Sequence, residues 1–424
     1  MKNKKFLSIL SIALLTTVLG GCSKKKVGAT EIAPYLFEVE TYHQLDEKFA
    51  DEYYRKNNDN WGGGCSAITK MTTDGTRLIG RNMDLNISNN CAYVVRTDAG
   101  KYKTIGLSYT FRDVSPKYDD VKKNGIPEEW GKLLPFFCDD VMNDQGLHIE
   151  INMRHAEYWP NGDDMFACKG TRPGAKKRVH MFELPRYIAE NCKDIEEAKS
   201  YVSSLDIYSK EHYWNYCFIL ADLSGKASLL EFSSDNVYWI DEDMVVDYQL
   251  KYLNLEPPFY NLNYHTIAQT NFYINFSSYV LQNTKSGFGR MQAMQNGIDI
   301  VTDRSSMYQL MDRISYGNFY LPYHECKSRH FDPRSEQLGE FKGASFDIIM
   351  NDSMEEWISR AMDAYSEPIR ALTRQQKRDD NKYWESTFTE VVVLNEKAIY
   401  VRFFEDENLK FKLDFNGFTK IESI

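Results

Sequence analysis

The sequence lacks the short motifs that identify most metal, redox and serine-hydrolase sites. Its 424 residues contain no Cys-x-x-Cys pair and no His-Glu-x-x-His, so no metal or cofactor is implied. They contain no Gly-x-Ser-x-Gly elbow either, which disfavours a serine nucleophile. The net charge is -10 and no basic patch lies outside the first residues, which argues against nucleic acid as a partner.

Cysteine is sparse and irregularly spaced. Eight cysteines could form disulfides in an exported protein, but their spacing matches no small disulfide scaffold. Some lie in apolar runs, such as Cys138 after Phe136 and Phe137, which favours buried thiols. We expect this state for Cys91, Cys138, Cys168, Cys192, Cys217 and Cys326.

The N-terminus has the pattern of an export signal. Three lysines within the first five residues precede an apolar stretch, Phe6–Val18. That stretch is too short and wrongly flanked for a stable membrane span. The following Leu19-Gly20-Gly21-Cys22 resembles a bacterial lipobox, which predicts lipid on Cys22. A plain signal peptide with an incidental cysteine is the alternative.

A glycine-rich stretch leads into a cysteine and then into a predicted hairpin. Gly62-Gly63-Gly64 precedes Cys65, and Asp74-Gly75 separates two short apolar runs, which is a hairpin signal. If the turn centres on Asp74-Gly75, residues whose numbers sum to 149 pair, so Cys65 faces Asp84. Arg81 would then point to the other face unless the strand bulges or bends.

These residue types suit nucleophilic chemistry. A thiol has a pKa of about 8.5, which a fixed cation such as Arg81 lowers. Cutting Gly64–Cys65 would give Cys65 an α-amine with a pKa of about 7.7–8.0, able to act as base for its own thiol. Asp84 can hold that amine. Glycine reaches the uncrowded backbone that attack on the Gly64 carbonyl needs. The alternative is a linker before a strand with a small core cysteine.

The spacing resembles the choloylglycine hydrolase and penicillin V acylase family of N-terminal-nucleophile hydrolases. It also resembles the related acyltransferases and acylethanolamine amidases. In that family the processed chain begins with Cys followed by Thr or Ser, here Cys65-Ser66. An arginine follows sixteen residues on and an aspartate nineteen residues on, here Arg81 and Asp84.

Three later segments extend the resemblance. The turn at 142–147 resembles one in the family, and Asn152 beyond it falls where the family places an oxyanion-hole side chain. Thr270-Asn271 resembles the element that supplies the other oxyanion donor. Arg290, in Gly-Phe-Gly-Arg, resembles an arginine that supports the nucleophile. Structural alternatives are an exposed strand position for Asn152, a strand end for Asn271 and a solvated helix position for Arg290.

The order of predicted elements indicates an α+β fold. We expect hairpins at 66–83, around 143–146, at 218–232 and at 388–403, and helices at 180–205, 286–298 and 354–374. The resemblance implies a four-layer αββα sandwich of two antiparallel sheets. The predicted organisation is a signal peptide at 1–22, a tether or pro-segment at 23–64 and a catalytic domain at 65–424.

The pro-segment decides where the enzyme resides. Lipid on Cys22 would tether the chain, but a cut before Cys65 would separate residues 23–64 from the catalytic domain. Apolar residues recur at roughly helical spacing over 31–58, which indicates packing on the domain and favours retention. We expect a protein of the bacterial cell envelope, either lipid-anchored or released after processing.

The resemblance implies a hydrolase of linear amides that works through an acyl-thioester. Its implied catalytic residues are Cys65, Arg81, Asp84, Asn152, Asn271 and Arg290. The implied partner is a small N-acyl amide of bile-salt, penicillin V, N-acyl lactone or N-acyl amine type. An acyltransferase of the same fold and a non-catalytic envelope lipoprotein that binds amides or peptides are the alternatives.

Overall fold

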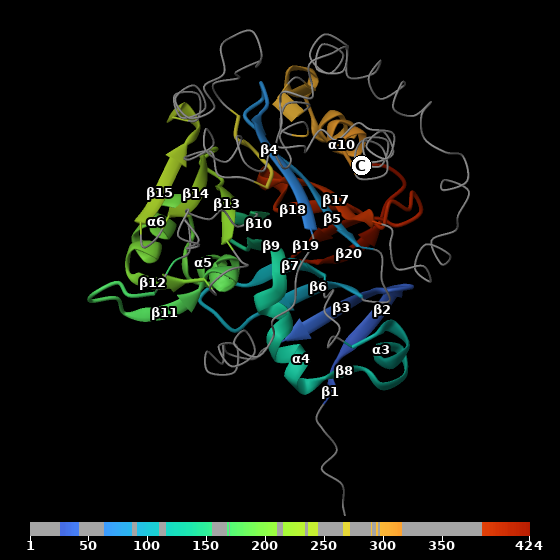
Figure 1. Ribbon diagram of the computed structural model, residues 1–424. Helices are drawn as coiled ribbons and strands as arrows, with labels where there is room; N and C mark the ends of the chain where they lie inside the picture. The colour runs from blue at the N-terminus through green and yellow to red at the C-terminus, as the bar shows by residue number, and fades with distance from the viewer. Residues whose placement is uncertain are drawn as a thin grey trace, which may run out of the picture.

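Two large β-sheets dominate the described part of the chain (Figure 1). The structure is a computed structural model. It describes residues 26–41, 63–86, 91–109, 116–154, 168, 170–209, 215–233, 236–244, 266–271, 290, 294–295, 297–315 and 384–424. The predicted signal peptide, with Cys22, lies outside these residues.

One sheet has nine strands and the other has seven. In spatial order the nine strands are β15 (Asn236–Asp241), β14 (Ala227–Ser233), β13 (Asn215–Ala221), β10 (His148–Arg154), β9 (Cys138–Asn143), β7 (Thr104–Tyr109), β6 (Ala92–Thr97), β3 (Leu36–Thr41) and β2 (Ala29–Ala33). The seven strands are β16 (Ala268–Gln269), β4 (Gly63–Met71), β5 (Arg77–Asn86), β17 (Trp384–Val393), β18 (Ala398–Phe403), β19 (Lys410–Asp414) and β20 (Gly417–Lys420).

Short helices and two small sheets complete the described part. The α-helices are α3 (Tyr118–Asn124), α4 (Glu128–Leu133), α5 (Leu184–Asn191), α6 (Ile195–Ser203) and α10 (Arg304–Arg313). The 3₁₀ turns are η1 (Leu134–Phe137), η2 (Met181–Glu183), η3 (Ile298–Ile300) and η5 (Leu394–Glu396). The small sheets pair β1 (Lys26–Val27) with β8 (Ile126–Pro127), and β11 (Lys177–His180) with β12 (Leu205–Tyr208).

The sheets pack against each other, with helices on their outer sides (Figure 1). Met142 and Leu229 of the nine-stranded sheet share one apolar cluster with Ile79 of the seven-stranded sheet. A second cluster joins Ile151 to Ile188 of α5 on the outer side. Helix α10 packs on β5 and β17. The expected four-layer αββα sandwich is therefore confirmed.

The nine-stranded sheet departs from the prediction in one pairing. Strands β3 and β6 pair in parallel, so this sheet is mixed rather than purely antiparallel. Strands β2 and β3 come from the segment before Cys65, and Leu36, Phe37 and Val39 are buried. The segment packs on the domain as expected, but the helical spacing predicted for 31–41 is wrong because this stretch is a hairpin. Residues 42–58 lie outside the described residues.

The β4–β5 hairpin forms as predicted, but its register differs by one residue. The Thr72 N–H donates to the Thr76 carbonyl at 2.9 Å. The Thr72 carbonyl accepts from the Gly75 N–H at 3.0 Å. Gly75 has φ +83°, so the loop has three residues and ends in a left-handed glycine. Paired residues therefore sum to 148, and Cys65 faces Met83, not Asp84 as predicted.

This register explains how the arginine reaches the thiol. Because side chains alternate along a strand, Arg81 shares the face of Met83 and Cys65. No bulge or bend of β5 is needed, contrary to the expectation from the two-residue turn. Asp84 lies on the other face, where a Cβ on Gly80 would meet Met311 of α10 at 2.6 Å.

Most other predicted elements that fall on described residues are confirmed. The hairpins β9–β10, β13–β14 and β17–β18 form. The helical region predicted at 180–205 forms as two helices, α5 and α6, and Asp194 before α6 accepts from the Glu197 N–H at 2.8 Å. The helix predicted at 354–374, and most of that at 286–298, lies outside the described residues. Among those described, no helix is long and apolar enough to cross a membrane.

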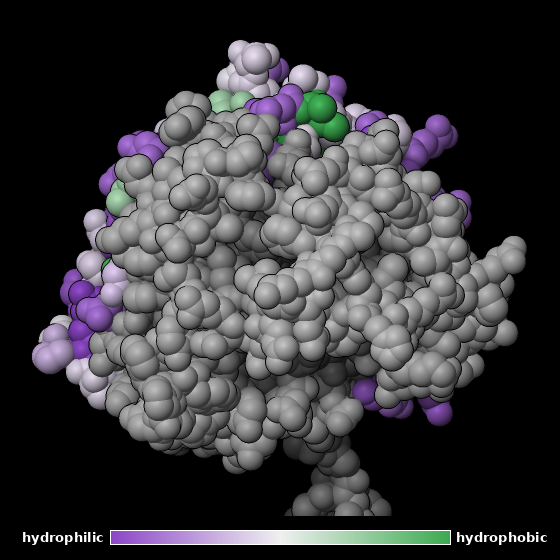
Figure 2. All heavy atoms as spheres, turned by 45° about the horizontal axis from the view of Figure 1, so that its top comes forward, coloured by the Kyte–Doolittle hydropathy of each residue, from purple (hydrophilic) through white to green (hydrophobic). Residues whose placement is uncertain are grey.

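The described residues visible in Figure 2 are mainly hydrophilic. Large hydrophobic side chains are exposed in this part of the chain at Leu223, Met244 and Ile300 only. Five of the cysteines expected to be buried thiols lie in the described part and are buried without a disulfide; they are Cys91, Cys138, Cys168, Cys192 and Cys217. Cys65 is also buried without a disulfide. Cys326 lies outside the described residues.

Candidate active site

Cys65 lies near the start of β4, in the apolar layer between the sheets. Its side chain is 2% exposed, and its Sγ donates to Met83 Sδ at 3.5 Å. Nη2 of Arg81 lies 3.9 Å from Sγ. Burial raises the pKa of the Cys65 thiol, and the Arg81 guanidinium opposes this rise. The thiol therefore needs a base before it can attack a carbonyl.

Arg81 is fully buried and connects the two sheets. Its Nη1 donates to the Asp139 carbonyl at 3.0 Å, and its Nη2 donates to the Ile151 carbonyl. It also forms an ion pair with Asp140, and its guanidinium lies over the Phe388 ring, 5.6 Å from the centroid. These contacts hold the cation in a fixed position beside the thiol.

Arg290 joins most of the remaining predicted residues. Its Nη1 donates to the Cys65 carbonyl at 2.7 Å and to Ser66 Oγ at 2.7 Å. The same nitrogen lies 3.4 Å from Asp84 Oδ2, and Nη2 donates to Asn271 Oδ1 at 2.6 Å. Arg290 is 1% exposed, so the alternative of a solvated helix position is wrong.

Asp84 lies on the helix-facing side of β5, away from the thiol. Its Oδ1 accepts from Ser386 Oγ at 2.5 Å, and its Oδ2 pairs with Arg290. Burial raises the pKa of Asp84 from 3.8 to about 6, an effect that Arg290 and the Ser386 hydrogen bond oppose. Asp84 therefore orients Arg290, and it is opposite Gly64 in the strand pair.

Asn271 contacts the backbone of the cysteine. It follows β16, which pairs with β4. Its Oδ1 accepts from the Cys65 N–H at 3.2 Å, and its Nδ2 donates to the Met153 carbonyl at 2.5 Å. An amide nitrogen carries two hydrogens, so one of them is left for a further acceptor. These contacts reach across to other strands, unlike those of a residue that merely ends its own strand.

Asn152 lies on the inner face of β10, opposite Cys217 of β13. The alternative of an exposed position is wrong, because Asn152 is 0% exposed. Neither polar atom of its carboxamide has a hydrogen-bond partner of good geometry among the described residues. The residues on either side, Ile151 and Met153, accept from Arg81 and Asn271. Its position is therefore fixed by the same groups that contact Cys65.

The structure thus brings the six predicted residues into one buried region, with Asp84 on the opposite face of β5 from the thiol. Sequence reasoning missed Ser386, Asp139 and Asp140, which contact them. Ser386 comes from β17, which pairs with β5 across about 300 residues of sequence. The sequence there gives no alternating pattern that would mark Ser386, because residues 385–390 are mostly polar and 391–393 are all valine.

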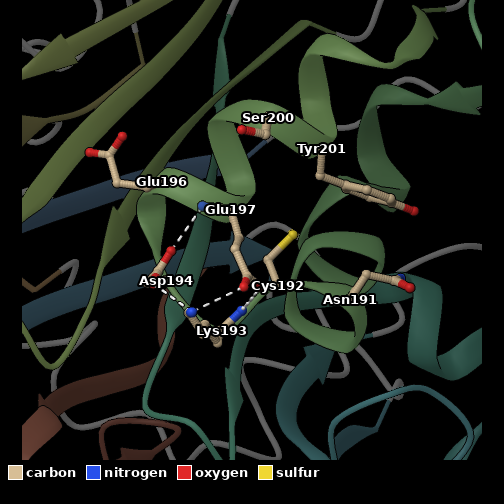
Figure 3. A pocket seen from close by; sticks show the side chains of 8 residues that line it. All are labelled: Asn191, Cys192, Lys193, Asp194, Glu196, Glu197, Ser200 and Tyr201. Atoms are coloured by element: carbon tan, nitrogen blue, oxygen red, sulfur yellow. Dashed lines mark hydrogen bonds and ion pairs between the residues drawn. The ribbon is translucent and has the colours of Figure 1, made fainter.

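A separate depression of about 440 Å³ lies at the start of α6 (Figure 3). It is lined by residues from the single segment 191–201, and its polar groups bond one another: Glu197 accepts from the Lys193 N–H at 3.0 Å. Burial raises the pKa of Cys192 to about 12, so this thiol is a poor nucleophile. The depression is therefore not the reactive site.

A buried thiol, a fixed guanidinium and two carboxamides are the groups that acyl transfer from an amide needs. The sequence profile of the linear amide C–N hydrolases of the choloylglycine hydrolase family matches residues 65–287, just over half of the chain. The chain belongs to this family. It is therefore a hydrolase of carbon–nitrogen bonds other than peptide bonds.

Solved structures similar to this chain include two amide hydrolases. One is a variant of conjugated bile acid hydrolase from Clostridium perfringens, at 14% identity and a TM-score of 0.41, covering 85% of this chain and 98% of that one. The other is penicillin V acylase from Agrobacterium tumefaciens, at 14% identity and a TM-score of 0.38, covering 83% and 86%. No curated protein sequence matches the chain.

Proposed function

We propose that the protein is a cysteine N-terminal-nucleophile amidase, activated by cutting its own Gly64–Cys65 bond. The observation that carries the proposal is the set of contacts at Cys65. The backbone nitrogen that would become the α-amine is held by Asn271 Oδ1 at 3.2 Å, and the carbonyl of the same residue is held by Arg290 at 2.7 Å. The family match also begins at Cys65.

The cut supplies the base that the thiol needs for repeated turnover. In the cut itself, water takes the thiol proton as Sγ attacks the Gly64 carbonyl, the C–N bond breaks as the Cys65 nitrogen gains a proton, and a second water hydrolyses the thioester. In the uncut chain the Cys65 nitrogen is an amide and cannot accept a proton. After the cut it is an amine with a pKa of about 7.7–8.0, attached to the carbon that bears the thiol. The amine takes the thiol proton, and Arg81 stabilises the thiolate. Asn271 accepts a hydrogen bond from the amine and orients its lone pair.

Turnover then follows in two stages. Sγ of Cys65 attacks the substrate amide carbonyl, and Asn152 and Asn271 donate to the oxyanion that forms. The C–N bond breaks, and the α-ammonium gives its proton to the leaving amine. Water, deprotonated by the same α-amine, attacks the thioester. The carboxylic acid leaves and the thiol is restored.

Two variants of Cys65 test the proposal. We expect Cys65→Ala to abolish both the cut and amide hydrolysis. Cys65→Ser keeps a hydroxyl nucleophile and should cut slowly, with hydrolysis reduced at least as much. Intact mass and N-terminal sequencing report the cut. Full activity in an uncut chain, or active protein without a Cys-Ser-Ala N-terminus, would contradict the proposal.

The acyl group of the substrate is proposed only as a class. Bile-salt, penicillin V and N-acyl amine types all present an apolar acyl group on a linear amide. A screen that varies the acyl group at constant amine, followed by liquid chromatography of the released acid, identifies it. Adding an acceptor amine distinguishes an acyltransferase, which would form a new amide in place of free acid.

A non-catalytic amide-binding lipoprotein is the second candidate to exclude. It would retain an uncut chain, whose Cys65 thiol is buried and has a raised pKa. Mild iodoacetamide treatment separates the two. Rapid alkylation at a new N-terminal cysteine supports the enzyme, whereas an unmodified precursor supports the binder.

We further propose that lipid on Cys22 holds the protein at the bacterial cell envelope. The lipobox sequence and the lysines that follow it support this localisation. Cys22→Ser should move the protein from the membrane fraction to the soluble fraction. Membrane retention of that variant would contradict the lipid anchor.

A further inference from the structure

A second group of polar side chains lies between the two sheets, behind Arg81. Asp140 comes from β9, His148 from β10 and Glu390 from β17. One ligand atom of each lies within 4.8 Å of the others. All three residues are 0% exposed. None of them touches the reacting atoms in the proposed reaction, and Asp140 takes part only by pairing with Arg81.

These side chains lack the partners that buried polar groups normally have. Neither ring nitrogen of His148 and neither carboxylate oxygen of Glu390 has a hydrogen-bond partner among the described residues. Glu150, two residues along β10 from His148, is also 0% exposed, and its carboxyl interacts with the Asn152 side chain. A buried polar group without a partner costs about 1–3 kcal/mol, and more when it is charged. Several such groups in one place point to a missing ligand.

The charges of the group identify the sign of that ligand. Asp140, Glu150 and Glu390 carry three negative charges when ionised, and Arg81, paired with Asp140, supplies one positive charge. At least two positive charges are still needed for neutrality, and the adjacent buried Asp139 adds a further negative charge when ionised. A divalent cation would offset most of this charge.

We propose that Asp140, His148 and Glu390 bind a divalent first-row transition ion, with Zn²⁺ as the representative. One imidazole and two carboxylates form a mixed nitrogen and oxygen donor set, which suits such an ion better than Ca²⁺ or Mg²⁺. Bonds of about 2.0–2.2 Å at tetrahedral angles place the ligand atoms about 3.4 Å apart. The three ligand atoms lie within 4.8 Å of one another, so ion binding would draw them together by about 1 Å.

The ion would have a structural role. It would join β9 and β10 of one sheet to β17 of the other, and β17 also pairs with β5, the strand that carries Arg81. Glu390 is directly opposite Arg81 in that pairing. The ion would therefore hold β9, β10 and β17 together around Arg81, without touching the substrate.

Metal analysis of the full-length protein tests the proposal. The protein is expressed with added Zn²⁺, dialysed, and measured by inductively coupled plasma mass spectrometry. We expect about one equivalent of metal per chain, and at least a tenfold loss in His148→Ala and in Glu390→Gln. His180→Gln is the matched control, because His180 is also buried but lies on β11, outside the group. It should keep the metal.

Thermal unfolding provides a second readout that does not depend on activity or on the cut. A chelator should lower the Tm of the wild type, and added Zn²⁺ should restore it. The chelator should not affect the Tm of folded His148→Ala. Wild-type protein that carries no stoichiometric divalent metal, with a Tm insensitive to added Zn²⁺, would overturn the proposal. That result would mean that protons neutralise the group. Full metal content in both ligand variants would overturn it as well.

Discussion

At the scale of single residues, the site depends on groups whose ionisation is shifted by burial. Asp84 is the clearest case, because its carboxyl is buried against Arg290 and Ser386 with a pKa of about 6. The shift means that the folded protein binds this proton more tightly than the unfolded chain does. Asp84 is neutral in acid, and it is charged at the pH where the enzyme is expected to work.

The first prediction concerns Asp84→Asn. A carboxyl whose pKa rises from 3.8 to about 6 on folding favours the folded state when protonated. The free energy of unfolding of the wild type, relative to the variant, should therefore fall by ~3 kcal/mol between pH 4 and pH 7. The difference in free energy of unfolding between the two proteins should not change with pH below or above that window. Urea unfolding of both proteins at each pH measures it.

Asp74→Asn is the control, because the contribution of Asp74 to stability should change with pH in the opposite direction. Asp74 accepts hydrogen bonds from Thr72 and Thr76 in the β4–β5 turn, which lower its pKa. Its contribution is present above the unfolded pKa and is lost as pH falls. If the stability of the wild type relative to Asp84→Asn instead rises between pH 4 and pH 7, the pKa of Asp84 is not raised by folding.

The second prediction separates the two carboxamides. Removing one oxyanion donor typically lowers kcat by about 10²–10³. We expect that loss in Asn152→Ala with little loss of stability, because in the described part of the chain its amide makes no hydrogen bond of good geometry beyond its interaction with the Glu150 carboxyl. Asn271→Ala should also slow the cut, since it removes the acceptor of the Cys65 N–H and a contact of Arg290. Single-turnover kinetics and intact mass report the two effects. If both variants slow the cut to the same extent, or neither does, the two carboxamides do not have the different roles proposed for them.

At the scale of elements, sequence predicts hairpins well and register poorly. The hairpins at 66–83, 143–146 and 218–232 form because turn chemistry and apolar alternation are local. The register of β4–β5 differs from the prediction because Asp74-Gly75 belongs to a three-residue loop. A shift of one residue reverses which side chains share a face, so the predicted place of Arg81 relative to Cys65 was wrong.

Polar strand positions were the other source of error. The alternation of His148, Glu150 and Asn152 with apolar residues indicates a strand with one face in solvent. In the structure that face lies against the second sheet, and all three residues are 0% exposed. Only the packing of β10 on β4 determines this, and that contact joins residues far apart in sequence. The same separation hides Ser386 and Glu390 from sequence analysis.

The third prediction tests the loop that sets the register. Gly75 has φ +83°, where a side chain costs about 1–2 kcal/mol. Gly75→Ala should therefore destabilise the protein by about that amount, although no atom lies within 4 Å of the added Cβ. Gly28→Ala is the matched control, because that glycine is also unobstructed and has no positive φ. Urea unfolding that ranks the two variants equally would contradict the loop assignment.

At the scale of the whole molecule, the proposed cut would fall inside a continuous structure. Gly63 and Gly64 pair with Leu85 and Asp84 in the strand that Cys65 continues. Earlier in the chain, β3 pairs with β6 over six residues and β2 forms the edge of the nine-stranded sheet. The body of the protein is therefore built from both sides of the cut. Cleavage would break one covalent bond without removing either sheet.

The last prediction follows from this arrangement and rests on the proposed cut. The fragment before Cys65 should stay bound, because Leu36 and Val39 are buried and Glu38 pairs with Arg96 at 2.6 Å. Size-exclusion chromatography of cut protein should give one peak that contains both fragments, separable only in denaturant. Val39→Asp, which buries a charge in the β3–β6 contact, should release the fragment. Thr30→Ala, at an exposed position of β2, should not. If the wild-type fragments separate without denaturant, β3 does not retain the pro-segment, and lipid on Cys22 could not hold the cut enzyme at a membrane.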